Sequence, residues 1–368
     1  MTPSETTLSS IRVLELASVL AGPLAGAALA ERGAHVTKVE RPPNGDVTRS
    51  WKTKNESSKG SSSAYYASAN GNKSVVWKDL KTVEGRAWLE EAFADHDVVI
   101  ENFKAADLPA FGLEAAALAS RHPHLVHVRL IGFQGQPERL AYDVVVQAET
   151  GFMHMNGSAK SPPLRMPVAL MDVLASHQIR AAVLEGLLAR ATGKSGFFAE
   201  VSLEASGVSA LVNQATNHLN AGASPHRNGG LHPNIAPYGD VLNCQNGFVV
   251  LAVGNDRQFA ALCAALGSAE WAQDPRFEIN QRRVQNREAL MELLQGAAGN
   301  WKKQALMAQL NGASVPAGMV KSLEEVFETD SNGANELVSN DDGQIRPRAV
   351  AYRVQCFGVR GDEPKTKG

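Results

Sequence analysis

Residues 11–41 read IRVLELASVLAGPLAGAALAERGAHVTKVER, and this stretch decides the fold. Its first six residues form a short apolar run that is typical of a buried strand. The segment that begins at Pro23 is rich in helix formers and ends at Gly33, and HVTKVER then has a second strand pattern. The stretch therefore predicts a strand, a helix and a second strand, which is the unit from which parallel sheets are built.

The same alternation continues along the first half of the chain. A helical stretch, KTVEGRAWLEEAFADH, precedes the strand pattern DVVIENF, and the helical AAALASRHP precedes the strand pattern LVHVRLIGF. A further helix is predicted over residues 173–191, where small and apolar residues recur at spacings of three and four. We therefore expect an α/β fold with a parallel sheet, whose ligands lie beyond the carboxyl ends of the strands.

The glycines of the first turn, together with Glu40 at the end of the second strand pattern, imitate a dinucleotide-binding fingerprint. The spacing of Gly22 and Gly26 is GxxxG rather than GxGxxG, and Pro23 lacks a backbone N–H that a pyrophosphate would need. We therefore interpret the two glycines as sites of close packing between helix and strand, with Pro23 at the first helical position.

The second half of the chain predicts a smaller α+β domain. A helical stretch at about 202–222 leads into a polar linker, and GDVLNCQNGFVVLAV then shows two strand patterns around a turn that contains Asn246 and Gly247. A helical segment follows, from RQFAALCAALG through MELLQGA. A chain of 368 residues is long enough for two domains.

Composition excludes several classes of protein. The 36 basic and 38 acidic residues give a net charge of −2, so no overall field attracts nucleic acid or an anionic membrane. Cys244, Cys263 and Cys356 are far apart and show no CxxC spacing, which argues against disulfides and zinc and favours a cytoplasmic location. No apolar run is long enough for a membrane span, and the first residues show no secretion signal.

Several segments, in this order, resemble class III CoA-transferases along nearly the whole chain. They are LASVLAGPLAGAALAERGAHVTKVERP, GDVTR, NGNKSVVWKDLKTVEGR, DVVIENF, YDVVVQAETG, TGKSGFFAEVSL, HPNIAPYGD and QDPRF. The family includes formyl-CoA and carnitine CoA-transferases and also α-methylacyl-CoA racemases. The resemblance implies that CoA is a substrate, that acyl-CoA and a small carboxylic acid are the partners, and that neither a metal nor a bound cofactor is needed.

The resemblance also implies an architecture. It consists of a large Rossmann-like domain from residues 1–200 and 311–368, a linker helix region at 201–225 and a small α+β domain at 226–310. In this family two chains interlock as a homodimer, and we carry that over as an expectation.

Asp172 is the candidate catalytic residue. The predicted helix begins near Val173, so Asp172 can cap its free N–H groups, and the helix dipole keeps the carboxylate ionised. In the family, the aspartate that follows a short apolar run, here Val168 to Met171, is the nucleophile. The resemblance therefore implies an aspartyl acyl anhydride and then an aspartyl-CoA thioester on Asp172.

The resemblance implies a CoA site as well. Arg41 follows the second strand pattern, Asn102 and Phe103 belong to the ENF segment, and Lys73 is a further candidate for a phosphate contact. Relatives carry an arginine shortly after ENF, whereas here Lys104 is the only nearby cation. We also place Tyr142 at this site.

Further departures from the family concern substrate and chain end. Leu20 occupies a position where formyl-CoA transferases have glutamine, so oxalate specificity is not supported. Only Asn228, Gly229 and Gly230 correspond to their longer glycine run, and the tail after residue 324 follows the family pattern poorly.

Two alternatives to transfer stay open at this point. A racemase needs two acid–base groups, and that branch has a histidine directly before an aspartate, whereas this chain has Tyr142 before Asp143. The ordinary pKa of tyrosine is about 10, which makes it a poor base at neutral pH. The other alternative is a non-catalytic CoA-binding protein.

Overall fold

The computed structural model describes residues 7–136, 138–328, 337–341 and 343–354. The chain divides into two compact units. The first contains Met1–Ala141, Met171–Ser206 and Asn335–Gly368, and the second contains Tyr142–Leu170 and Gly207–Ala334. This division by contacts places 142–170 and 311–334 in the second unit, whereas the ranges expected from the sequence assign them to the large domain.

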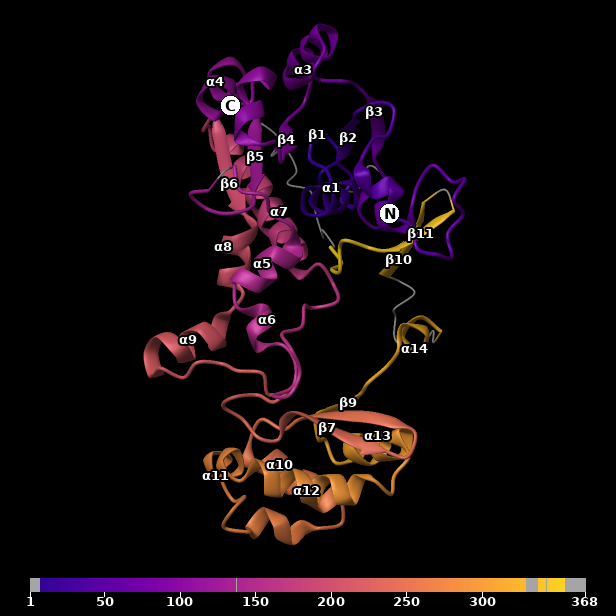
Figure 1. The fold of residues 1–368 in the computed structure, drawn as a ribbon, viewed down its shortest axis with the longest axis vertical. Helices are drawn as coiled ribbons and strands as arrows, with labels where there is room; N and C mark the ends of the chain where they lie inside the picture. The colour runs from indigo at the N-terminus through magenta and orange to yellow at the C-terminus, as the bar shows by residue number, and fades with distance from the viewer. Residues whose placement is uncertain (1–6, 137, 329–336, 342, 355–368) are drawn as a thin grey trace, which may run out of the picture. The chain divides into compact units, whose positions relative to one another are not determined.

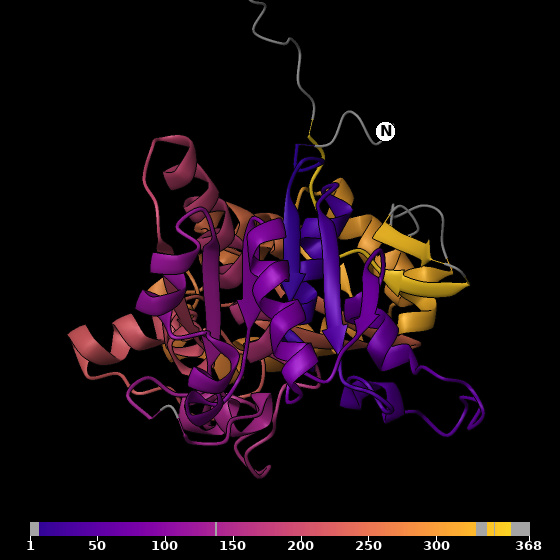
Figure 2. The ribbon, with the colours of Figure 1, turned by 90° about the horizontal axis from the view of Figure 1, so that it is seen from above.

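The first unit is built on a six-stranded parallel sheet with the strand order β3-β2-β1-β4-β5-β6. The strands are β1 (Arg12–Glu15), β2 (His35–Glu40), β3 (Ser74–Trp77), β4 (Val98–Glu101), β5 (Val126–Ile131) and β6 (Phe197–Ser202). Figure 2 shows strands of this sheet side by side with their arrowheads pointing the same way. The predicted α/β fold with a parallel sheet is confirmed.

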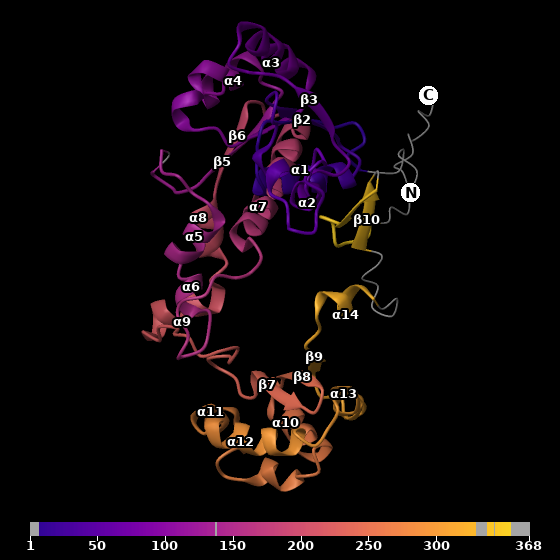
Figure 3. The same ribbon diagram turned by 45° about the vertical axis from the view of Figure 1, so that its right-hand side comes forward.

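Helices cover both faces of this sheet. The helices in the segments of the first unit are α1 (Ala21–Glu31), α2 (Ala64–Asn70), α3 (Val83–Asp95), α4 (Ala115–Arg121), α7 (Leu170–Ala191) and α8 (Leu203–Ser209), whose last three residues belong to the second unit, and the short 3₁₀ turns are η2 (Val47–Ser50), η3 (Ala105–Asp107) and η4 (Pro109–Phe111). Figures 1 and 3 show α3 and α4 on one side of the sheet and α1 and α7 on the other. Leu14 and Val99 of the sheet pack with Leu89 and Phe93 of α3 in a buried apolar core.

The interpretation of the first-turn glycines agrees with the packing of α1. A Cβ added at Gly22 would collide with the side chain of Ala17, and one added at Gly26 would collide with the carboxylate of Glu15. Pro23 is the third residue of α1 rather than the first, because the helix begins at Ala21. The glycines therefore let α1 lie close against the end of β1.

A C-terminal segment completes the first unit. The hairpin of β10 (Val338–Asp341) and β11 (Gln344–Pro347) packs on α2. Arg346 is buried and pairs with Glu31 at the end of α1 and with Asp341. Glu31 also accepts hydrogen bonds from the backbone N–H groups of Ala349 and Val350, at 3.0 and 2.9 Å. These contacts hold residues 346–350 against the C-terminal end of α1.

The second unit contains a three-stranded antiparallel sheet with the order β7-β8-β9. Its strands are β7 (Tyr238–Cys244), β8 (Gly247–Ala252) and β9 (Ala317–Met319). Its helices are α5 (Asp143–Glu149), α6 (Phe152–Met155), α9 (Val212–Ala221), α10 (Asp256–Ala265), α11 (Asn280–Gln285), α12 (Arg287–Ala298), α13 (Lys303–Gly312) and α14 (Leu323–Phe327), with the 3₁₀ turn η5 (Ala269–Gln273). The predicted hairpin is confirmed, since β7 and β8 pair around a turn at 245–246.

Two predicted helices are interrupted. The stretch expected at about 202–222 forms α8 and then α9, and Val212 at the start of α9 has a positive φ of 39°. The segment expected to run from residue 257 through MELLQGA forms α10 and α12, with η5 and α11 between them. In the part of the chain that the structure describes, no helix has the length and apolar character that crossing a membrane requires.

Candidate functional site

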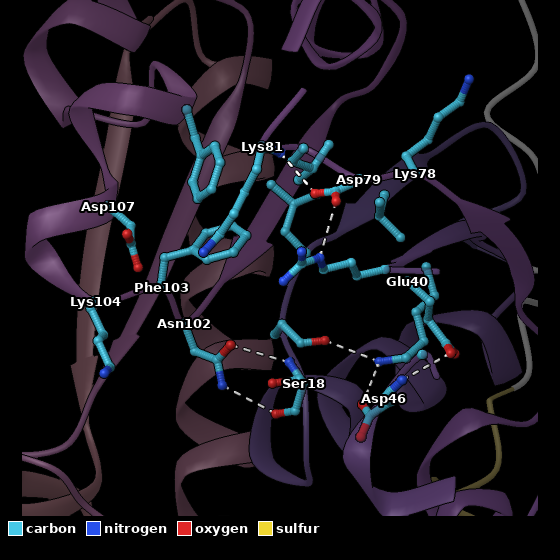
Figure 4. Close-up of a pocket in the computed structure, with 18 residues that line it drawn as sticks. Ser18, Glu40, Asp46, Lys78, Asp79, Lys81, Asn102, Phe103, Lys104 and Asp107 are labelled. Carbon is cyan, nitrogen blue, oxygen red and sulfur yellow. Dashed lines mark hydrogen bonds and ion pairs between the residues drawn. The ribbon is translucent and has the colours of Figure 1, made fainter. Parts of the chain in front are cut away.

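A pocket of about 300 Å³ lies in the first unit, beyond the carboxyl ends of β1 to β4 (Figure 4). It is lined by Leu16, Ala17, Ser18, Lys38, Val39, Glu40, Arg41, Gly45, Asp46, Lys78, Asp79, Leu80, Lys81, Asn102, Phe103, Lys104, Asp107 and Phe111. Parallel strands bring the residues that follow them to one edge of the sheet. Four of the predicted site residues, Arg41, Asn102, Phe103 and Lys104, meet here for that reason.

Asn102 fixes the loop that follows β1. Its Oδ1 accepts a hydrogen bond from the backbone N–H of Ser18 at 3.1 Å, and its Nδ2 donates to the carbonyl of Ser18 at 3.1 Å (Figure 4). The ring of Phe103 packs against that of Phe111, with the centroids 4.7 Å apart. This side of the pocket therefore offers aromatic surface on which a planar ring can stack.

Four of the five cations that line the pocket are not buried. They are Arg41, Lys78, Lys81 and Lys104, against the carboxylates of Asp79 and Asp107. The side chain of Arg41 is 62% exposed, and its Nε lies 3.2 Å from Oδ2 of Asp79. In Figure 4 the side chain of Lys78 extends away from the other labelled residues. The excess of positive charge suits an anionic group such as a phosphate.

Lys78 and Lys81 were missed by the sequence reasoning. The signal that could have found them is the segment WKDLK, which follows β3 directly. Residues after β3 reach the same edge of the sheet as those after β1 and β2, because all these strands are parallel. No strand is predicted from the sequence at 74–77, so the lysines that follow β3 have no predicted place.

Glu40 at the end of β2 is fully engaged inside the protein. It accepts hydrogen bonds from Arg49 at 2.6 and 2.8 Å, from the hydroxyl of Tyr66 at 2.6 Å and from the backbone N–H of Asp46 at 3.0 Å. Burial would raise the pKa of Glu40, but the hydrogen bonds from Arg49 and Tyr66 outweigh it and lower the pKa. A carboxylate held in this way is not available to a ribose, which agrees with the rejection of a dinucleotide fingerprint.

The structure does not bring Lys73 to this pocket. Its side chain is completely buried, and Nζ contacts Glu15, the carbonyl of Pro23 and Oδ1 of Asn70. Burial, with repulsion from Lys38 adding to it, lowers the pKa of Lys73 to about 8, although Glu15 acts in the opposite direction. With three donors used inside the unit, Lys73 has none left for a phosphate.

Asp172 lies in the first turn of α7, in the first unit. The helix begins at Leu170, so Asp172 is its third residue and does not precede the helix as the sequence predicted. The first turn still places the carboxylate near free N–H groups and the positive end of the helix dipole, which favours its ionised form. Its side chain is half-buried.

Tyr142 belongs to the second unit and precedes α5. Its side chain is 58% exposed and makes no capping hydrogen bond. The next residue, Asp143, is buried, and its Oδ2 accepts a hydrogen bond from Gln147 at 2.6 Å. Tyr142 and Asp172 thus lie in different units, and neither lines the pocket of the first unit.

Neither a metal site nor a disulfide is seen within the described ranges. No group of three or more histidine, cysteine, aspartate or glutamate side chains is arranged to hold a metal ion there. Cys244 and Cys263 are free thiols. Cys356 lies outside the described residues.

Comparisons with known proteins agree along the chain. The model of "CoA-transferase family III" matches residues 8–367, which includes the tail after residue 324, where we expected little resemblance. A succinate–glutarate CoA-transferase of Agrobacterium fabrum is 37% identical over 350 residues, which are 92% of this chain and 87% of that protein. The human succinyl-CoA:glutarate CoA-transferase is 32% identical over 364 residues, covering 97% and 82%.

Solved structures show the same fold. A CAIB/BAIF family protein from Brucella suis matches with a TM-score of 0.81 and 36% identity, covering 95% of this chain and 93% of that one. A protein from Mycobacterium tuberculosis matches with a TM-score of 0.83 and 26% identity, over the same shares of the two chains.

Proposed function

The chain belongs to CoA-transferase family III, and we propose that it moves CoA from an acyl-CoA to a free carboxylic acid through intermediates on Asp172. The observation that carries the proposal is the pocket at the carboxyl ends of β1 to β4, where Arg41, Asn102 and Phe103 meet. These are the residues that the family resemblance assigns to CoA.

Each step on Asp172 exchanges one acyl bond for another. The carboxylate attacks the thioester carbonyl, the C–S bond breaks and CoA leaves as a thiolate, so that a mixed anhydride between Asp172 and the donor acid remains. The thiolate then attacks the carbonyl of Asp172, which forms an aspartyl-CoA thioester and releases the donor acid. The acceptor acid reverses these two steps, so no oxidant, reductant or net proton is needed.

The position of Asp172 suits this role. A nucleophilic carboxylate must be ionised, and the first turn of α7 favours the negative charge through the helix dipole. The same dipole favours the Asp172 carboxylate as the leaving group in the last step, when the CoA thiolate attacks the acceptor acyl group of the second anhydride.

We propose that the pocket of the first unit holds the nucleotide end of CoA. The adenine would stack against Phe103, while Arg41, Lys81 and Lys104 would contact phosphates. Lys81 would supply the positive charge for the phosphates that relatives obtain from an arginine shortly after the ENF segment, which is residues 101–103 here.

A dicarboxylic acid is the substrate class that the relatives favour. The Agrobacterium fabrum and human proteins are named for succinate and glutarate. We therefore propose that this chain exchanges CoA between short dicarboxylates. Both named relatives are transferases, which supports transfer over the racemase alternative.

The decisive experiment is a mass-spectrometric assay of CoA exchange from succinyl-CoA to a panel of acids, with glutarate first. Asp172→Asn should abolish exchange, whereas Glu185→Gln, an exposed carboxylate change on the same helix, should leave it intact. Hydroxylamine added during turnover should convert Asp172 to a hydroxamate, found by peptide mapping. CoA exchange that persists in Asp172→Asn would rule out the mechanism through Asp172.

Two further measurements separate the alternatives. Deuterium from D₂O entering the α-carbon of a 2-methylacyl-CoA without CoA migration would establish the racemase. CoA binding without either reaction would establish a binding protein.

The CoA site has its own test. Lys81→Ala should raise KM for acyl-CoA about tenfold, which corresponds to about 1.4 kcal/mol for one lost charged contact. Lys54→Ala removes an exposed lysine outside the pocket and serves as the control. Equal KM values in the two variants would exclude Lys81 from the site.

We also propose that two chains form the interlocked homodimer that the family resemblance implies. One chain has a mass of 39.2 kDa. Light scattering should therefore report twice that value, and a monomer mass at assay concentration would contradict the proposal.

A further inference from the structure

The loop Ala17–Val19, between β1 and α1, is held by side chains from three other parts of the first unit. The carbonyl of Ala17 accepts a hydrogen bond from Nζ of Lys38 at 3.0 Å. Both backbone groups of Ser18 bind Asn102, and the backbone N–H of Val19 donates to Oδ2 of Asp46 at 3.1 Å. Four consecutive polar groups of the loop backbone are thus hydrogen-bonded to side chains, and not to the backbone of a helix or sheet.

Val19 has a backbone conformation that needs such support. Its φ is +72°, in the left-handed region that a β-branched residue rarely adopts. Strained residues of this kind persist only where the surroundings fix them, and they gather at functional sites. The hydrogen bond to Asp46 is the contact that holds Val19 itself.

Lys38 and Asp46 form one buried unit with this loop. The ammonium of Lys38 lies 3.1 Å from Glu15 and 3.1 Å from Oδ2 of Asp46, and its third contact is the carbonyl of Ala17. Both side chains are 1% exposed. The other oxygen of Asp46 accepts from the backbone N–H and the hydroxyl of Thr48, at 3.0 and 2.7 Å.

Each charge in this cluster stabilises the ionised form of its partner. Burial would lower the pKa of Lys38, but Glu15 and Asp46 outweigh it and raise the pKa. Burial would raise the pKa of Asp46, but Lys38 and Thr48 outweigh it and lower the pKa. The pair is therefore ionised at neutral pH. Since a buried ion pair is weak evidence for stability, a role in fixing one conformation is the better explanation.

The loop also forms part of the pocket wall. Ala17 and Ser18 line the pocket together with Lys38 and Asp46. We propose that Lys38 and Asp46 are positioning residues for the CoA site, which hold Val19 in its left-handed conformation and so give the loop the shape that CoA binds. This inference rests on the proposed function of the pocket.

Asp46→Ala tests the proposal, because it removes the acceptor for Val19 and the partner of Lys38. Calorimetry should show CoA binding weakened about tenfold, equivalent to about 1.4 kcal/mol, and KM for acyl-CoA should rise by the same factor with a smaller change in kcat. CoA binding does not depend on the chemical step. A wild-type protein that binds CoA without exchange would therefore contradict the proposed reaction and leave the positioning role testable.

A rescue experiment separates positioning from a merely structural role. Glycine adopts a positive φ without strain, so adding Val19→Gly to Asp46→Ala should restore CoA binding to within about threefold of wild type. Adding Val47→Gly, which changes an exposed valine next to Asp46, should restore nothing. Unchanged CoA binding in Asp46→Ala, or equal rescue by both glycines, would overturn the proposal.

If Asp46→Ala does not fold, Asp46→Asn replaces it. The amide oxygen can still accept from Val19, but the charge that pairs with Lys38 is lost. We then expect a smaller loss of CoA affinity, again rescued by Val19→Gly and not by Val47→Gly. The absence of that difference would also overturn the proposal.

Discussion

Gly26→Ala should destabilise the first unit although alanine is the better helix former. In an open helix position the change stabilises by about 0.5–1 kcal/mol. At Gly26 the new Cβ would overlap the carboxylate of Glu15, which is fully buried and lies 3.1 Å from Lys38 and 2.8 Å from Lys73. Relieving the overlap moves Glu15 away from two buried ammonium groups, and breaking such a pair costs about 3–5 kcal/mol.

The net loss in free energy of unfolding should be about 2–4 kcal/mol, once the helix gain is subtracted. Urea unfolding followed by circular dichroism measures it as a lower midpoint with an unchanged slope. Gly296→Ala in α12 is the matched control, since a Cβ there meets nothing within 4 Å. A Gly26→Ala protein as stable as wild type would refute the reasoning, because glycine would then not be required by Glu15.

Three other outcomes follow from buried polar groups. Arg283 is fully buried and donates hydrogen bonds to the carbonyls of Ala236 and Phe277. Arg283→Met should therefore lower the free energy of unfolding by about 2–5 kcal/mol. A loss below about 1 kcal/mol, measured by urea unfolding, would contradict this prediction. The lowered pKa of Glu40 in the folded state adds stability that is complete above the ordinary carboxyl pKa of about 4 and is lost as pH falls further. Urea midpoints between pH 7 and 3 should therefore fall less steeply in Glu40→Gln, and identical profiles would count against the linkage. Burial raises the pKa of Cys263 to about 12, so iodoacetamide at pH 8 should label it only after unfolding, as peptide mapping would show.

The centre of the sheet could be predicted from the sequence, but its edges could not. All four residues of β4 are buried, which produces the continuous apolar pattern of a central strand. The edge strand β3 has no buried residue, and β6 alternates along most of its length. Their patterns are weaker because each has a neighbour on one side only.

The sequence likewise predicts only part of the candidate site. The residues after β2 and β4 were predictable, since the carboxyl ends of parallel strands share one edge. The burial of Lys73 was not, because its partner Glu15 is 58 positions away and only the packing of Gly26 makes room for that carboxylate. The role of Asp172, the homodimer and the cytoplasmic location stay predictions.

The contact between Glu31 and Arg346 joins residues 315 positions apart. A ribosome adds roughly 5–20 residues per second, so roughly 15–60 s pass between the synthesis of these two residues. During that interval the nascent first unit lacks the guanidinium and the hairpin that cover the end of α1. The unit that is synthesised first is therefore completed last, and the end of α1 lacks this cover until residue 346 has been synthesised.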